Sequence, residues 1–261
     1  IVGEQKKLIQ SSISAPKSTN WIVQKKQLGT GHAVKQALPF LRANSQAVVL
    51  YGDGPLVKVS TLKKLIFDAA KNNLTLLTFE SANPKGLGRI IRESNSKVSG
   101  IVEEKDASSS EKKIKEVNSG ILATSTKNLQ QWLPKLRNNN ASKEYYLTDI
   151  VALCSSENKK IKAINLGDTS ELLGANDNQE LQNLERIYQK ETALGFLKNG
   201  VKFADINRVD FRGEVSIGKN AFIDINVVLE GKVSIGSDSI ISTGAVIRNS
   251  TLSKKIKVEP Y

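Results

Sequence analysis

The chain has 261 residues, enough for two domains, and apolar residues make up 39% of it. Its single cysteine, Cys154, excludes an internal disulfide, and with one histidine, His32, it cannot supply the four nitrogen and sulfur ligands of a structural zinc site. The net charge of +12 comes from lysines scattered along the chain without interleaved aromatic residues, which favours solvated lysine-rich faces over nucleic-acid binding.

The sequence carries neither a secretory nor a membrane signal. It does not open like a signal peptide, and it contains no run of eighteen apolar residues, so we expect no membrane span. A lone thiol fits a reducing compartment, and we therefore expect a cytoplasmic protein. Methionine is absent throughout, including position 1, so we expect the sequence to be a fragment of a longer protein.

Strand and helix patterns alternate through residues 1–175. Strands are predicted at residues 21–23, 47–51, 74–79, 121–124 and 161–166. Helices are predicted at residues 31–41, 60–71 and 128–136. This alternation predicts an α/β layer with a mostly parallel sheet, in which ligands bind beyond the carboxyl ends of the strands.

A longer helix is predicted at residues 178–197, where apolar residues form a stripe with helical spacing. Asn176 or Asp177 can cap its start, and Gly200 can end it. We interpret this helix as a connector between an α/β part and a repeat part.

An apolar residue recurs every six positions near the end of the chain. The column consists of Phe211, Ile217, Ile223, Leu229, Ile235, Ile241 and Ile247. A second column of small or β-branched residues stands two positions earlier in each repeat. Six residues make one short strand and a turn, and three such units close a triangular coil that stacks on the next. The pattern predicts a hexapeptide β-helix of two to three coils, with an adjustment at one corner after Ile247, where the period slips by one residue.

Two segments of the α/β part carry candidate site residues. Asp53 stands in the turn after the strand at residues 47–51, where its carboxylate can hold Mg²⁺ or serve simply as a turn residue, and the spacing favours neither. Gly29 and Gly31 flank Thr30 at a helix start, which can bring backbone N–H groups close to a nucleotide. Without further information, the charged run at residues 103–106 is typical of a solvated loop.

Taken together, seven motifs resemble one family, the bacterial bifunctional N-acetylglucosamine-1-phosphate uridyltransferase/glucosamine-1-phosphate acetyltransferase. In chain order they are QLGTGHA (27–33), LYGDGPL (50–56), GLGRI (86–90), GIVEEKDA (100–107), EVNSGI (116–121), NNNASKEYYLTDI (138–150) and LLGAN (172–176). Each motif alone is weak, but their order and the hexapeptide repeat that follows are specific.

The resemblance implies a fold and an activity. It implies a Rossmann-like nucleotidyltransferase domain at residues 1–175, a connecting helix at 176–200 and the start of a left-handed parallel β-helix at 201–261. The implied reaction joins UTP to N-acetylglucosamine 1-phosphate, giving UDP-N-acetylglucosamine and pyrophosphate. The full protein would also acetylate glucosamine 1-phosphate from acetyl-CoA, assemble as a homotrimer through the β-helix, and supply precursors of peptidoglycan and lipopolysaccharide.

The resemblance also implies roles for individual residues. Asp53 and Asn176 would hold Mg²⁺, which suits one carboxylate and one amide oxygen. The uridine would lie against Gln24, Gly29 and Thr30. The ribose and the N-acetylglucosamine would lie among Tyr51, Gly52, Gly88, Glu103 and Asn118. Tyr146 and Thr148 would make second-tier contacts.

The sequence departs from the family at both ends. Nothing in residues 1–20 matches the glycine-rich phosphate loop, and the later coils with the acetyltransferase site are absent, so no acetyltransferase residue is assigned. Two alternatives remain open. One is another sugar-1-phosphate nucleotidyltransferase, thymidylyl or adenylyl, against which Glu103 and Asn118 argue. The other is an inactive trimerising scaffold.

Overall fold

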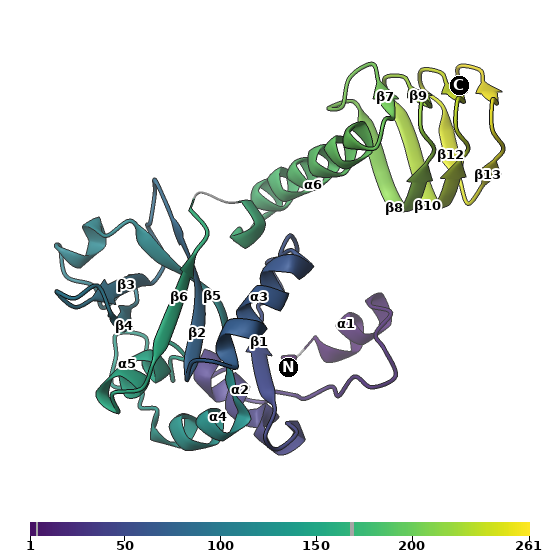
Figure 1. Ribbon diagram of the computed structural model, residues 1–261. Coiled ribbons are helices and arrows are strands. Elements are labelled where there is room, and N and C mark those ends of the chain that lie inside the picture. The colour runs from purple at the N-terminus through teal and green to yellow at the C-terminus, as the bar shows by residue number, and fades with distance from the viewer. Residues whose placement is uncertain (4, 168–169) are drawn as a thin grey trace. The chain divides into compact units, whose positions relative to one another are not determined.

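The computed structural model describes residues 1–3, 5–167 and 170–261 (Figure 1). The chain divides into two compact units, Ile1–Leu173 and Gly174–Tyr261. The second unit includes the predicted connecting helix together with the repeats. The three-part division at residues 175 and 200 stays a prediction.

A six-stranded sheet forms the centre of the first unit. Its strands are β1 (Gln46–Val49), β2 (Leu74–Glu80), β3 (Arg89–Arg92), β4 (Val98–Val102), β5 (Glu116–Ser125) and β6 (Ile161–Asn165). The order is β4-β3-β5-β2-β6, and β1 also pairs with β5. One edge of β5 pairs with β2, and the other pairs with β1 near one end and with β3 near the other.

The prediction of a mostly parallel sheet is wrong. Strands β2 and β6 pair in parallel, but β5 is antiparallel to β1, β2 and β3, and β3 is antiparallel to β4. The reason is that β5 inserts between β1 and β2 with the opposite direction, which periodicity along the chain does not reveal. The strand predicted at residues 21–23 is also wrong, since among the described residues only Val23 pairs, in a single bridge with Val2.

The described residues of the first unit also form five α-helices. Their bounds are α1 (Lys6–Ser12), α2 (Thr30–Ala37), α3 (Val59–Ala69), α4 (Thr126–Trp132) and α5 (Asp149–Ser156). Short 3₁₀ turns are η1 (Leu38–Phe40), η2 (Glu111–Lys113), η3 (Leu133–Lys135) and η4 (Ser170–Leu172). The helices predicted near residues 31–41, 60–71 and 128–136 are therefore confirmed as α2 with η1, α3, and α4 with η3.

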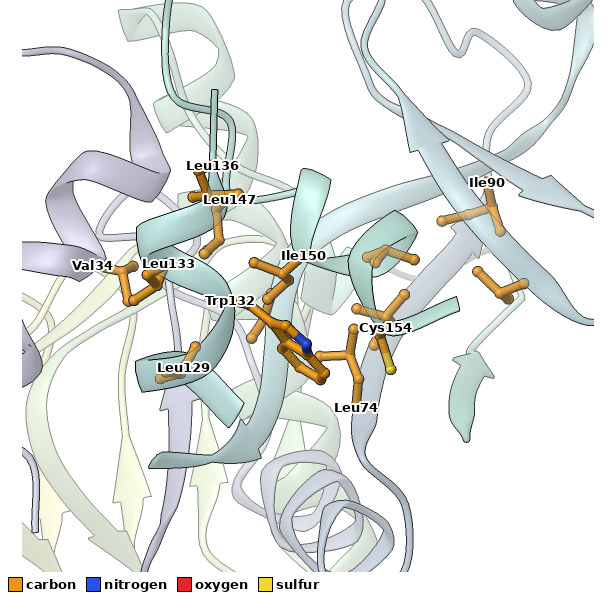
Figure 2. Packing of buried hydrophobic residues seen from close by; sticks show 14 residues of the cluster. Val34, Leu74, Ile90, Leu129, Trp132, Leu133, Leu136, Leu147, Ile150 and Cys154 are labelled. Atoms are coloured by element: carbon orange, nitrogen blue, oxygen red, sulfur yellow. The ribbon is translucent and has the colours of Figure 1, made fainter. Parts of the chain in front are cut away.

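Two apolar clusters lie on opposite faces of the sheet. One joins α2, α4 and α5 to the sheet around the fully buried Trp132, with Leu74 and Leu122 from the strands (Figure 2). The other joins α3 to Leu77 and Ala123. Because side chains alternate between the faces of a strand, β2 and β5 can feed both clusters. None of the helices in the described ranges combines the length and apolar character that a bilayer crossing requires.

The second unit is a helix followed by a parallel β-solenoid. Helix α6 spans Asn178–Lys198, and the strands are β7 (Lys202–Phe203), β8 (Val209–Ile217), β9 (Phe222–Ile223), β10 (Val227–Ile235), β11 (Ile240–Ile241), β12 (Val246–Arg248), β13 (Thr251–Leu252) and β14 (Lys257–Val258). Leu229 pairs with Phe211 on one side and with Ile247 on the other, as the six-residue period predicts. The predicted slip is also confirmed, since Ile235 pairs with Leu252 and the register is shorter by one residue.

Helix α6 packs on the first coil through one buried polar contact. The Gln189 side chain accepts the N–H of Phe211 (2.7 Å) and donates to its carbonyl (2.9 Å). It thereby occupies the hydrogen-bonding positions that a neighbouring strand would fill on the edge of β8. Asp177 caps the helix by accepting the N–H of Glu180 (2.8 Å), which confirms one of the two predicted caps.

Candidate functional site

Tyr51 lies where three distant segments of the first unit converge. It follows β1, its ring lies against Gly120 in β5, and Thr30 at the start of α2 and the carboxylates of Glu103 and Asp53 lie close enough to influence its hydroxyl. The residue is 39% exposed, but loss of solvent around its hydroxyl and the nearby Glu103 charge raise the pKa of Tyr51. The phenol therefore stays neutral and able to donate a hydrogen bond at physiological pH.

Gly120 makes room for the Tyr51 ring. It has a φ of +79° in the middle of β5, where the pairing with β2 is irregular. A Cβ built at this position would collide with the Tyr51 ring. Gly120 is not among the predicted site residues, although a lone glycine inside a strand signals a bulge or a close approach.

The segment that begins α2 is held against residues 144–147. Tyr145 accepts the N–H of Gly31 (2.8 Å), and its own N–H donates to Leu28 (2.8 Å). Gly29 has a φ of +103°, and a Cβ there would lie 2.7 Å from the Tyr145 carbonyl oxygen, so no larger residue fits without rearrangement. The Gln24 side chain donates to the Gly29 carbonyl (3.1 Å). Gln24, Gly29 and Thr30 therefore lie together.

A second group of predicted site residues gathers at the ends of β3 and β4. The Thr148 hydroxyl donates to Glu103 Oε1 (2.8 Å), and a Cβ at Gly88 would lie 3.2 Å from Glu103 Oε2. The N–H of Asn118 donates to the Gly88 carbonyl (2.8 Å). Glu103 is half-buried, so the solvated loop suggested by its charged neighbours alone is wrong at this position, because Thr148 and Gly88 enclose the carboxylate.

Gly52, Asp53 and Asn176 lie in exposed segments between helices and strands. Gly52 has open space around its Cα, and Asp53 is exposed beside it. Asn176 belongs to the second unit, where its amide nitrogen donates to Glu180 (3.1 Å) and its amide oxygen stays available. A carboxylate and an amide oxygen are donors that Mg²⁺ accepts, so these residue types fit the ion. Within the described residues, no three His, Cys, Asp or Glu side chains gather as a metal site, and the pairing of Asp53 with Asn176 stays a prediction.

The structure consists of an α/β unit and a unit with a parallel β-solenoid, and family models match both parts. The model described as nucleotidyl transferase matches residues 3–180, and the model described as bacterial transferase hexapeptide (six repeats) matches residues 214–249. The chain belongs to the nucleotidyl transferase family.

Two curated relatives are similar to the chain over most of its length. The chain is 44% identical over 263 aligned residues to the bifunctional protein GlmU of Baumannia cicadellinicola, covering 100% of this chain and 56% of the relative. It is 45% identical to the bifunctional protein GlmU of Nitrosococcus oceani, covering 88% of this chain and 51% of the relative. The resemblance predicted from the seven motifs is confirmed, and the chain spans about half the length of these relatives.

Among solved structures, a Bacillus anthracis protein assigned as a glucose-1-phosphate thymidylyltransferase matches with a TM-score of 0.48 and 20% identity. The match covers 63% of each chain. At that distance it bears on neither the fold nor the function of this chain.

Proposed function

We propose that this chain is the uridyltransferase part of a bifunctional enzyme, joining UTP to N-acetylglucosamine 1-phosphate to give UDP-N-acetylglucosamine and pyrophosphate. The convergence at Tyr51 carries the proposal. Tyr51 lies near both the segment proposed for the uridine (Gln24, Gly29 and Thr30) and the carboxylate proposed for the sugars, Glu103.

The reaction requires no covalent intermediate with the protein. An ionised oxygen of the sugar phosphate attacks the α-phosphorus of UTP in line, and the bond from that phosphorus to the β-phosphate oxygen breaks as pyrophosphate leaves. The nucleophile is already ionised near neutral pH, so no general base is required. Catalysis then consists of positioning the two substrates and balancing their charge.

The residues present suit that positioning. The Glu103 carboxylate can accept hydrogen bonds from sugar hydroxyls while Thr148 holds its other oxygen. The Asn118 side chain can both donate and accept, as an acetamido group requires. Gly29 allows the backbone to approach a flat base closely. Mg²⁺, held by Asp53 and Asn176, would neutralise phosphate charge when bound.

The wider proposal concerns the full-length protein. We assign it glucosamine-1-phosphate acetylation with acetyl-CoA as co-substrate, a homotrimeric assembly through the β-helix, and a cytoplasmic role in supplying cell-wall precursors. Support comes from the hexapeptide-repeat match and from the bifunctional relatives. No observation favours the thymidylyl, adenylyl or inactive-scaffold alternatives over this one.

The test is Mg²⁺-dependent pyrophosphate release from UTP and N-acetylglucosamine 1-phosphate. We expect Asp53→Ala to lower the rate by about a hundredfold or more, because a metal ligand is lost. Asp68→Ala, in α3, is the control and should keep the wild-type rate. Undiminished release by Asp53→Ala would exclude the metal assignment, and preferred use of dTTP or ATP would favour the other transferases.

A further inference from the structure

Arg89 is a buried cation with one carboxylate partner among the residues that the structure describes. It opens β3 and is 1% exposed. Its Nη2 donates to Glu104 Oε2 (2.6 Å) and to the Lys112 carbonyl (3.4 Å), and its Nη1 donates to the Leu87 carbonyl. Its Nε has no hydrogen-bond partner among the described residues. A buried charge with one counter-ion depends strongly on that counter-ion.

Glu104 binds the loop before β3 as well as Arg89. The same oxygen, Oε2, accepts the N–H of Gly86 (3.2 Å), which has a φ of +84°. The hydrogen bond from Arg89 lowers the pKa of Glu104, so this carboxylate stays ionised at neutral pH. Glu104 therefore ties two points of the 86–89 segment to the end of β4.

This ion pair lies where the β3–β4 ladder ends. Arg89 pairs with Val102 at the end of that ladder. Gly88 and Glu103 lie one residue further on, beyond the paired residues, and a Cβ at Gly88 would lie 3.2 Å from Glu103. The printed β3–β4 pairing does not include Gly88 and Glu103. The residues that follow them in the chain, Arg89 and Glu104, form the ion pair that links the two segments.

We propose that Arg89 and Glu104 are positioning residues that set the separation of Gly88 and Glu103, and thereby the affinity for the sugar portion of the ligand. The inference rests on the proposed function and goes further by placing these two residues against the N-acetylglucosamine rather than the ribose. The pair contacts none of the residues proposed for the uracil. Its loss should therefore weaken sugar recognition and leave recognition of the uridine nucleotide intact.

A second ion pair at the other end of β3 provides a matched control. Arg92, the last residue of the strand, pairs through Nε and Nη2 with both carboxylate oxygens of Glu116 (2.8 and 2.9 Å). Arg92→Ala removes an arginine from the same strand while leaving the Gly88–Glu103 end untouched. This variant therefore measures the effect on ligand binding of losing an ion pair elsewhere in the sheet.

The experiment is calorimetric titration of UDP-N-acetylglucosamine and of UDP into the wild type, Glu104→Ala, Glu104→Gln and Arg92→Ala, with thermal unfolding of each. We expect Glu104→Ala to weaken UDP-N-acetylglucosamine binding about tenfold, a loss typical of residues that hold a ligand-contacting residue in place. UDP binding should stay unchanged. Glu104→Gln keeps an acceptor for Gly86 and Arg89 but loses the negative charge beside the buried Arg89, so it should still weaken UDP-N-acetylglucosamine binding, by less than Glu104→Ala does. Arg92→Ala should keep the wild-type ratio of the two affinities.

The outcomes distinguish failure of the positioning role of Arg89 and Glu104 from failure of the proposed function. A wild-type ratio in Glu104→Ala, with the wild type binding both ligands, would overturn the positioning role alone. If Glu104→Ala does not fold, a wild-type ratio in Glu104→Gln has the same meaning. If the wild type binds neither ligand, the proposed function fails, and the role of the pair fails with it.

Discussion

The contact between Gly120 and Tyr51 shows how one backbone position shapes the site. Gly120→Ala would place a methyl group against the Tyr51 ring at a φ of +79°. We expect a loss of about 1–3 kcal/mol in the free energy of unfolding and weaker binding of UDP-N-acetylglucosamine, since the tyrosine must move. Chemical denaturation and calorimetry measure the two effects.

Gly100→Ala is the control for this change. Gly100 also lies in a strand, β4, but nothing stands within 4 Å of a Cβ built there. It should alter stability by less than about 0.5 kcal/mol and leave binding unchanged. Equal effects at the two glycines would contradict the assigned contact.

The single thiol gives a second prediction at the residue scale. Cys154 is fully buried under α4 and β2, and this burial raises its pKa to about 12. The folded protein should therefore react with iodoacetamide at pH 8 far more slowly than the urea-unfolded chain. Reaction at the unfolded rate under native conditions would show that the thiol is accessible.

At the scale of elements, Gln189 joins α6 to the solenoid. Gln189→Ala leaves the Phe211 N–H and carbonyl without their side-chain partner in a buried position, which should cost about 2 kcal/mol in the free energy of unfolding. Gln182→Ala, on the exposed side of the same helix, should cost less than about 0.5 kcal/mol. Similar losses in both variants would mean that Gln189 does not anchor the helix.

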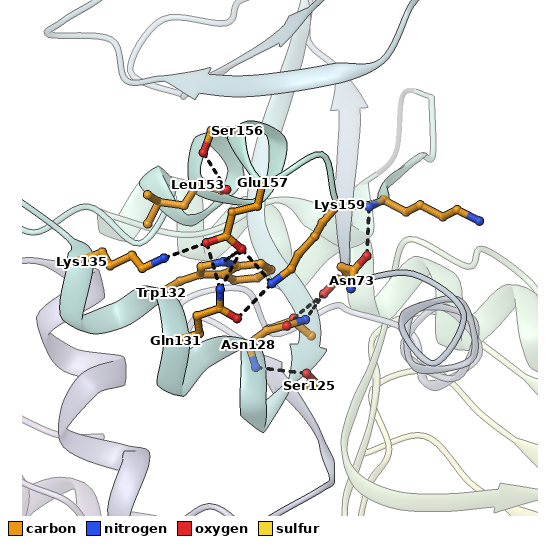
Figure 3. Close-up of polar contacts among 12 residues, drawn as sticks. Asn73, Ser125, Asn128, Gln131, Trp132, Lys135, Leu153, Ser156, Glu157 and Lys159 are labelled. Atoms are coloured by element: carbon orange, nitrogen blue, oxygen red, sulfur yellow. Dashed lines mark hydrogen bonds and ion pairs between the residues drawn. The ribbon is translucent and has the colours of Figure 1, made fainter.

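Glu157 links α4 to the end of α5 and makes stability depend on pH. It accepts from Lys135 (2.7 Å), Lys159 (2.7 Å) and the Trp132 indole (3.1 Å), as Figure 3 shows. The hydrogen bonds from Lys135 and Lys159 lower the pKa of Glu157 from 4.5 to about 2.

Because the folded pKa lies below the unfolded one, the stabilisation is complete above pH 4.5 and is lost as the pH falls towards 2. Glu157→Gln should flatten the fall in unfolding free energy across that window. An unchanged pH profile in the variant would exclude Glu157 as its source.

An element could be predicted from the sequence only where its structure imposes a distinctive residue pattern. The solenoid register is readable because a six-residue period forces Phe211, Leu229 and Ile247 into one stack. The direction of β5 is not readable, since a buried strand has the same pattern whichever way it runs. The candidate site shows the same contrast. Family motifs predicted Glu103 and Gly88, whereas the Arg89–Glu104 pair depends on side-chain contacts between β3 and the loop after β4.

At the scale of the whole chain, family models match a nucleotidyl transferase region at residues 3–180 and hexapeptide repeats at residues 214–249, and two similar curated relatives are named bifunctional protein GlmU. The first unit contains Tyr51, Glu103 and the other proposed uracil and sugar contacts, and the second contains the solenoid. We therefore assign nucleotide and sugar recognition to the first unit.

The most direct test is calorimetric titration of the unmodified chain with UDP-N-acetylglucosamine, dTDP-glucose and ADP-glucose. The proposed site predicts that UDP-N-acetylglucosamine binds at least about tenfold more tightly than the other two, because both the base and the acetamido group are recognised. Equal affinity for all three, tighter binding of dTDP-glucose or ADP-glucose, or no binding at all, would contradict the assignment.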